Sequence, residues 1–330
     1  MPHPQSLLVA GAAAAAVAAT LLVRPAAGSG PTAQLQLLAP GIICTGAYET
    51  HPAFSPSGDT LYFLTCSPDL SSNTICVSYR RAGQWTSPEV ASFSGQYVDA
   101  DPFVSRDGRT LYFISDRPVQ PGGPPKTDMD IWRVRRGPSG WSAPVHLDAP
   151  LNSPQDEYYP TLTNAGTLYF GSTRPGGFGG SDLYRCPLQA GGAGPIENLG
   201  AGVNTADNEY EPFVAPDESY LLFVATHPAG LQHADLYLAH PQAGSWGPAS
   251  KLPAPFNSSS TEFSPKVSRD GRTFYFASTR PTFPVPLPAA ESMAQLRQRL
   301  AQPGNGLGDI YQVAASALPL AAPAAGAGDK

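Results

Sequence analysis

Short apolar runs alternate with polar turns along most of the chain. Runs such as LYF and LLF each follow a tight turn, written RDG, SGD, NAG or PDE. Asp, Asn and Gly suit such turns because they tolerate a positive φ or hydrogen-bond their own backbone. The aromatic and β-branched residues in the runs favour a pleated strand. The pattern predicts β-hairpins throughout, and one short amphipathic helix within residues 288–302.

This hairpin pattern occurs five times. Each copy has a proline ahead of its first turn, and the prolines recur at intervals of 50 to 58 residues: Pro52, Pro102, Pro160, Pro212 and Pro265. In four of the copies a Gly/Pro-rich loop is followed by DIW, DLY or DIY. Each copy is interpreted as four short strands, a to d. The period suits one four-stranded blade of a β-propeller.

The fifth copy ends after its third strand, DIYQV. At the other end of the chain, LQLLAP from Leu35 matches VHLDAP from Val145, which lies in strand d of the second copy. We therefore expect the N-terminal segment to supply strand d of the last blade and to leave no open sheet edge. The predicted fold class is all-β: a five-bladed β-propeller of four-stranded blades, closed by the N-terminal strand.

The N-terminus predicts export. Residues 1–28 contain a 17-residue apolar stretch from Leu7 to Val23, followed by small residues of the kind signal peptidase accepts. We expect cleavage, a propeller over residues 29–313 and a flexible Ala/Pro/Gly tail over residues 314–330. The protein would then be periplasmic or secreted. The alternative is an uncleaved N-terminal membrane anchor, because 17 residues are near the lower limit for a span.

Four cysteines are consistent with export. Cys66 closes strand b of the first copy, and Cys76 lies near the start of strand c in the same hairpin. A disulfide between Cys66 and Cys76 is therefore expected. Cys44 is a competing partner for Cys66, and four free thiols are the remaining alternative.

Charge and motifs exclude several function classes. The net charge is −6 and no basic stripe is present, which argues against nucleic-acid binding. The sequence has no G-x-S-x-G, no H-E-x-x-H and no phosphate-binding loop. We expect a monomer without a cofactor or a bound metal, and without a membrane span once the signal is removed.

Three kinds of charged residue recur in register. An acid stands three residues before each proline: Glu49, Asp99, Glu157, Glu209 and Glu262. Three copies place an arginine just after strand b: Arg117, Arg174 and Arg280. Four copies open strand c with an aspartate: Asp130, Asp182, Asp235 and Asp309. All these positions fall on one face of a propeller, so we expect the three kinds to meet there.

Two interpretations of this pattern remain open. In the first, which we favour, each arginine lies between two carboxylates and pins the loops of its blade. In the second, five acids surround the mouth of the central channel, where they could hold a cation or supply the carboxylates of a glycosidase. Phe178 and Phe283, in b–c loops on the same face, are expected to be exposed and to contact a partner.

The units SRDGRTLYFISDRP…DIWRV and SRDGRTFYFASTRP…DIYQV resemble the TolB-like, WD-repeat-like propeller repeat of bacterial envelope proteins. The resemblance extends over residues 35–313 and implies a periplasmic protein-interaction module. The function expected from it is non-catalytic binding of an envelope protein or glycan through the face that carries the b–c loops. The alternative is a glycan-active hydrolase or lyase that uses acids at the channel mouth.

Overall fold

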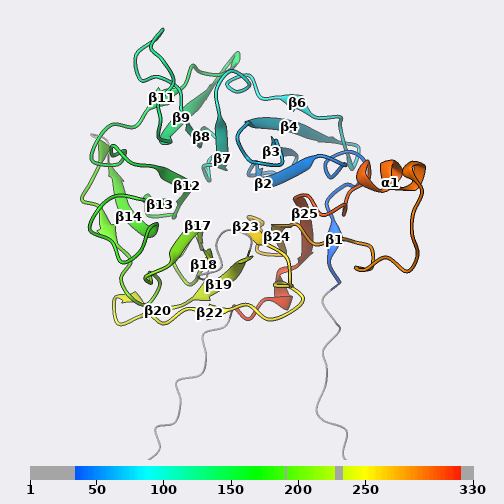
Figure 1. Cartoon of the computed structure of the whole chain (residues 1–330). Coiled ribbons are helices and arrows are strands. Elements are labelled where there is room, and N and C mark those ends of the chain that lie inside the picture. Colours follow the sequence, from blue (N-terminus) through cyan, green and yellow to red (C-terminus); the bar gives the residue numbers. More distant parts are fainter. Residues whose placement is uncertain (1–33, 190–191, 227–232, 321–330) are drawn as a thin grey trace, which may run out of the picture. The chain divides into compact units, whose positions relative to one another are not determined.

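Five antiparallel sheets surround a central axis in the computed structural model, which describes residues 34–189, 192–226 and 233–320 (Figure 1). The innermost strands, a, are β2 (Tyr48–Phe54), β7 (Asp99–Val104), β12 (Glu157–Leu162), β17 (Asn208–Val214) and β23 (Glu262–Val267). Strands b are β3 (Thr60–Cys66), β8 (Thr110–Ser115), β13 (Thr167–Ser172), β18 (Leu221–Thr226) and β24 (Thr273–Ser278). Strands c are β4 (Asn73–Arg81), β9 (Asp130–Gly137), β14 (Asp182–Gln189), β19 (Ala234–Ala239) and β25 (Asp309–Ala314). The five-bladed propeller predicted from the repeats is confirmed.

The outermost strands are short. Blades one to three split strand d into two pieces that both pair with strand c: β5 (Gln84–Trp85) and β6 (Glu89–Val90), β10 (Gly140–Trp141) and β11 (Val145–His146), and β15 (Gly192–Ala193) and β16 (Glu197–Asn198). Blade four uses β22 (Ser250–Lys251), next to a small hairpin of β20 (Pro241–Gln242) and β21 (Ser245–Trp246).

Blade five is completed by the N-terminal strand, as expected. β1 (Gln36–Leu37) pairs antiparallel with β25, and Gln36 lies opposite Gln312. The next residue continues the contact, because Leu38 N–H donates to the carbonyl of Ile310 at 2.8 Å. Every blade therefore has a covered outer edge on strand c.

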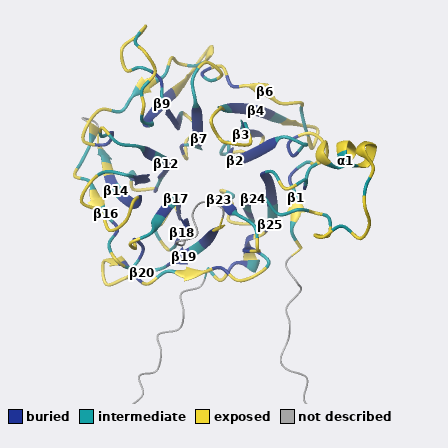
Figure 2. Ribbon diagram, in the orientation of Figure 1, coloured by how far each residue is buried: buried dark blue, intermediate teal, exposed yellow. Residues whose placement is uncertain are grey.

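The apolar runs supply the core between neighbouring sheets. The phenylalanine that ends each LYF-type run is at most 1% exposed: Phe63, Phe113, Phe170, Phe223 and Phe276. Figure 2 shows the burial concentrated in the inner strands, with the loops and the short outer strands exposed. Because all five runs follow the same period, the same apolar motif supplies the buried phenylalanine of every blade.

The helix is shorter than the amphipathic pattern predicted. α1 (Met293–Leu300) begins after a capping box, in which Ser292 and Gln295 exchange hydrogen bonds, and none of its residues is buried. The propeller also continues beyond Val313: a 3₁₀ turn, η2 (Ala315–Ala317), follows β25, and Ala315 and Leu318 are buried. No helix among the described residues is long and apolar enough to cross a membrane. Residues 1–28 and the last ten residues lie outside the described part.

The expected disulfide between Cys66 and Cys76 is wrong, because all four cysteines are free and buried. Cys76 lies opposite Phe63 in the β3–β4 pairing, whereas Cys66 lies opposite Asn73. Cross-strand partners point to the same face of a sheet and successive residues alternate. Cys66 is three residues beyond Phe63, so the two thiols point to opposite faces of blade one.

We predict four reactive thiols in the denatured chain. After unfolding in denaturant without reductant, a maleimide should label all four cysteines, because no pair of thiols is joined in the native fold. Mass spectrometry of the labelled protein would count them. Only two labelled cysteines would show that a disulfide forms despite this register.

Candidate functional site

The five acids that precede the prolines are buried and fully engaged. Glu157 accepts hydrogen bonds from the backbone N–H and the hydroxyl of Ser153, at 2.9 and 2.6 Å, and from the hydroxyl of Ser172 at 2.8 Å. Arg174 donates to the same carboxylate at 3.0 Å. Burial raises the pKa of Glu157, although these hydrogen bonds and Arg174 favour its charged form. Such a carboxylate pins the loop that enters strand a.

The other blades repeat this arrangement with variations. Glu49, Glu209 and Glu262 each accept two hydrogen bonds from the Thr or Ser four residues earlier, as Glu157 does. Asp99 instead accepts from the hydroxyl of Ser94. All five carboxylates belong to residues that are at most 3% exposed. The hypothesis of a ring of open acids at the channel mouth is therefore wrong for these positions.

The arginines bind the acids but not the strand-c aspartates. Arg280 donates to Glu262 at 3.0 Å, and to the carbonyls of Pro255 and Phe256 at 2.7 and 2.8 Å. Its guanidinium also lies over aromatic rings of its own blade. The same pairing joins Arg117 to Asp99 and Arg174 to Glu157. Each arginine ties strand a to the preceding interblade loop.

The strand-c aspartates have separate partners, which corrects the expectation of one arginine between two carboxylates. Asp130 binds Lys126 and His146, and Asp235 binds Lys251 at 2.6 Å. Asp309 accepts from the backbone N–H of Gly304 at 2.7 Å. Asp182 accepts from the backbone N–H of Phe178 at 2.6 Å. These aspartates therefore fasten the b–c loops or strand d of their own blades.

The residues just before the five prolines form a second set that the sequence pattern did not reveal. They are His51, Asp101, Tyr159, Glu211 and Ser264, and all five have φ between 48° and 56°. In all five blades strand a carries a register shift at this position, a β-bulge that redirects the side chain. The shared signal in the sequence was a polar residue before each proline on the innermost strand.

Three of these side chains form a charged triad drawn from three different blades. His51 Nε2 lies 3.1 Å from Asp101 and 3.1 Å from Glu211. Burial alone would lower the pKa of His51, but the carboxylates of Glu211 and Asp101 outweigh it and raise the pKa to about 9. His51 is therefore a cation at neutral pH, and the triad links blades one, two and four.

Lys266, the residue after Pro265 in blade five, lies near this triad. Its side chain is buried, and its Nζ is 3.9 Å from the centroid of the Tyr159 ring. Burial lowers the pKa of Lys266 to about 7, against the opposing attraction of Asp101 and Glu211. Among the described residues no three His, Cys, Asp or Glu side chains are arranged to hold a metal ion.

Exposed apolar side chains gather on the face that carries the b–c loops, which we call the b–c face. Of the nine large apolar side chains that are strongly exposed in the described part of the chain, six lie in b–c loops: Leu70, Val119, Phe178, Val285, Met293 and Leu300. Ile42 is on a loop that enters strand a at the same face. Only Val90 and Val145 lie elsewhere, on outer strands.

The two phenylalanines expected on this face differ. Phe178 is 52% exposed, as predicted, and its loop is held by Asp182. Phe283 is only partly exposed, because Arg299 of α1 lies 4.5 Å from the centroid of its ring. Phe283 therefore also supports the long loop of blade five, and its contact with a partner stays a prediction.

That long loop is fastened to blade one. Asn305 donates to the carbonyl of Gly46 at 3.0 Å. A Cβ at Gly46 would lie 2.6 Å from the backbone of Ala301, so only glycine allows this close approach. The helix α1 and its exposed Met293 and Leu300 are thus held at the b–c face by the Asn305 side chain and by close packing of the Gly46 and Ala301 backbones.

No family model and no curated protein matches the sequence. Several solved structures are similar to this chain. A candidate TolB from Agrobacterium tumefaciens has a TM-score of 0.47 and 14% identity, and the match covers 81% of this chain and 90% of that one. An α-L-arabinofuranosidase from Lactobacillus brevis has a TM-score of 0.51 and 13% identity, with 83% and 92% covered. A Penicillium chrysogenum α-L-arabinanase has a TM-score of 0.46 and 13% identity, and the match covers 87% of this chain and 100% of that one. At these identities the similarity concerns the fold alone. The five-bladed propeller of this chain agrees with the resemblance to TolB-like repeats at the level of the fold.

Proposed function

We propose that the protein is a non-catalytic binding propeller, exported to the periplasm or secreted, which contacts a protein of the cell envelope through its b–c face. The observation that carries the proposal is the concentration of exposed apolar side chains in the b–c loops. An exposed apolar patch on a soluble protein is typical of an interaction site, and Val285, Met293 and Leu300 all belong to one loop. Aliphatic side chains such as Val285, Met293 and Leu300 favour a protein partner over a glycan.

The burial of the repeated acids supports a binding role as well. A hydrolase needs two carboxylates that face substrate, whereas these five are enclosed by hydrogen bonds within their blades. The loops that they and the strand-c aspartates hold include the one with Phe178. A rigid frame that presents apolar loops is what a binding module requires.

The test uses the wild type, a triple variant and a double control variant as baits in an envelope extract. In the first, Phe178, Met293 and Leu300 become Ser; in the control, Val90 and Val145 become Ser. A partner captured by the wild type is identified and purified, and its affinity for each variant is measured. We expect the b–c face variant to bind at least about tenfold more weakly, since each lost apolar contact costs about 1 kcal/mol or more, and the control to bind like the wild type. Equal binding by both variants would contradict the proposal.

A glycan hydrolase is the second candidate, favoured by one observation. Asp101 and Glu211 both lie 3.1 Å from the same His51 nitrogen, so their carboxylates are close together at the channel axis. Retaining glycosidases place two carboxylates about 5–5.5 Å apart. Here, however, a cationic imidazole lies between them. Cleavage of an arabino-oligosaccharide by the wild type, lost in Glu211→Gln, would favour this candidate over the binding module.

A further inference from the structure

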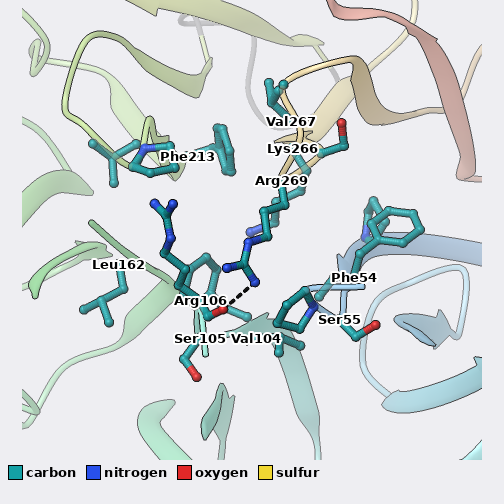
Figure 3. A pocket seen from close by; sticks show the side chains of 18 of the residues that line it. Phe54, Ser55, Val104, Ser105, Arg106, Leu162, Phe213, Lys266, Val267 and Arg269 are labelled. Carbon is teal, nitrogen blue, oxygen red and sulfur yellow. Dashed lines mark hydrogen bonds between the residues drawn. The ribbon is translucent and has the colours of Figure 1, made fainter. Parts of the chain in front are cut away.

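The end of the channel opposite the b–c face contains a cavity of about 190 Å³. It is lined by the last residues of all five a strands and by the turns that follow them, which define the a–b face. Figure 3 shows the lining side chains converging on this space. Phe103, Leu162, Phe213 and Val267 provide its apolar walls. The cavity is therefore separate from the surface assigned to the partner protein.

Lys266 lines the cavity, and its buried amino group has no anionic partner among the described residues. The residue is 6% exposed, and no carboxylate of the described residues forms an ion pair with it. Its Nζ is instead enclosed by aromatic rings, with centroids of Tyr159, Phe103 and Phe213 at 3.9, 5.4 and 5.8 Å. The nearby carboxylates, Asp101 and Glu211, are engaged with His51. Burying an ammonium group in this way is costly unless an anion joins it.

Two arginines also line the cavity, and no acid is among the lining residues. Arg106 and Arg269 come from the a–b turns of blades two and five. Arg269 extends across the cavity and donates to the backbone carbonyl of Arg106 (Figure 3). Arg106 in turn donates to the side chain of Asn164. In a protein with a net charge of −6, this is a local positive site over apolar walls.

We propose that this cavity binds a small organic anion with an apolar body, a monocarboxylate of about eight to ten non-hydrogen atoms. Its size fits that class, because a cavity of about 150 Å³ accommodates benzene. The carboxylate pairs with Lys266, and the apolar body packs against Phe103, Leu162 and Phe213. Arg106 and Arg269 attract the anion to the mouth.

The first experiment is calorimetric titration of the purified protein with hexanoate and benzoate, and with 1-hexanol and hexylamine as neutral and cationic counterparts. It is run at pH 6, where Lys266 is protonated. We expect both carboxylates to bind at least about tenfold more tightly than hexanol, with no binding of hexylamine. If hexanol binds as tightly as hexanoate, the proposed anion site is wrong.

Variants then locate the site. Lys266→Met should weaken hexanoate binding at least about tenfold. Arg272→Gln, which removes an exposed charge from the same turn outside the cavity, should leave it unchanged. Thermal unfolding reports whether each variant is folded. Should Lys266→Met not fold, Leu162→Trp decides the matter, because it fills the cavity and should abolish binding. Full affinity in either folded variant would overturn the proposal.

Discussion

Glu262→Ala is expected to lower the free energy of unfolding by about 3–5 kcal/mol, the range for removing one partner of a buried ion pair. The Glu262 carboxylate accepts hydrogen bonds from Ser258 N–H and hydroxyl at 3.0 and 2.6 Å, and from the Ser278 hydroxyl at 2.9 Å. It also pairs with Arg280 at 3.0 Å, in a site where the carboxylate is fully buried. Without it, the guanidinium and the loop donors lose their acceptor. Urea unfolding monitored by tryptophan fluorescence measures the loss.

Glu197→Ala is the matched control. Glu197 also pairs with an arginine at 3.0 Å, but its side chain is 58% exposed and that of Arg185 is 32% exposed. Exposed pairs contribute about 0–1 kcal/mol because water and salt screen them. We expect the control to lose less than about 1 kcal/mol. Similar losses in the two variants would show that the repeated acids do not pin the loops as described.

His51→Gln is expected to destabilise the protein strongly at pH 6 and much less at pH 10. The substitution leaves the nearby Asp101 and Glu211 carboxylates without their shared cation. Because the pKa of His51 is raised to about 9 in the folded state, its contribution is fully present below its unfolded pKa of about 6.5. It is lost as the pH rises through 9. The linkage relation gives a change of about 3 kcal/mol across this window.

The titration of Lys266 changes the stability with pH in the direction opposite to that of His51. Lys266 must therefore be replaced before the effect of His51→Gln is compared between pH values. Its folded pKa is lowered to about 7, so the unfolded chain binds more protons above that pH and stability rises toward the unfolded pKa of about 10.4. The effect of His51→Gln is therefore measured in the Lys266→Met background, by urea unfolding at several pH values. A destabilisation that stays constant from pH 6 to pH 10 would show that His51 is not charged in the fold.

The fold was predictable because one local rule recurs five times. Each LYF run, turn and proline occurs in register, so their spacing predicted the blades, and the mismatch at the chain ends predicted the closure through β1. The acids that precede the prolines were recognised for the same reason. Their burial against Ser153 or Ser258 depends on the loop four residues earlier, which the repeat pattern did not single out.

The channel triad could not be predicted in the same way. His51, Asp101 and Glu211 occupy the register position before the proline, where the other two blades have Tyr159 and Ser264. The five residues share neither charge nor residue type, so a comparison of the copies treats the position as variable. The meeting of the three triad residues depends on a bulge that turns strand a toward the axis, and on three blades distant in sequence. The disulfide was mispredicted for a related reason. The sequence showed that Cys66 and Cys76 lie in one hairpin, but not that the strand register points them to opposite faces of the sheet.

The closure of blade five through β1 has a consequence for how the protein comes to be folded. Gln36 emerges from the ribosome among the first residues of the propeller, yet its partner, Gln312, is among the last. During synthesis the last blade cannot be completed until β25 has emerged, so the earlier blades form an open arc until then. Contacts between such distant segments slow folding. A truncation that removes only β25 should therefore leave β1 without a strand to pair with. The remaining open arc would expose strand edges that are prone to aggregation.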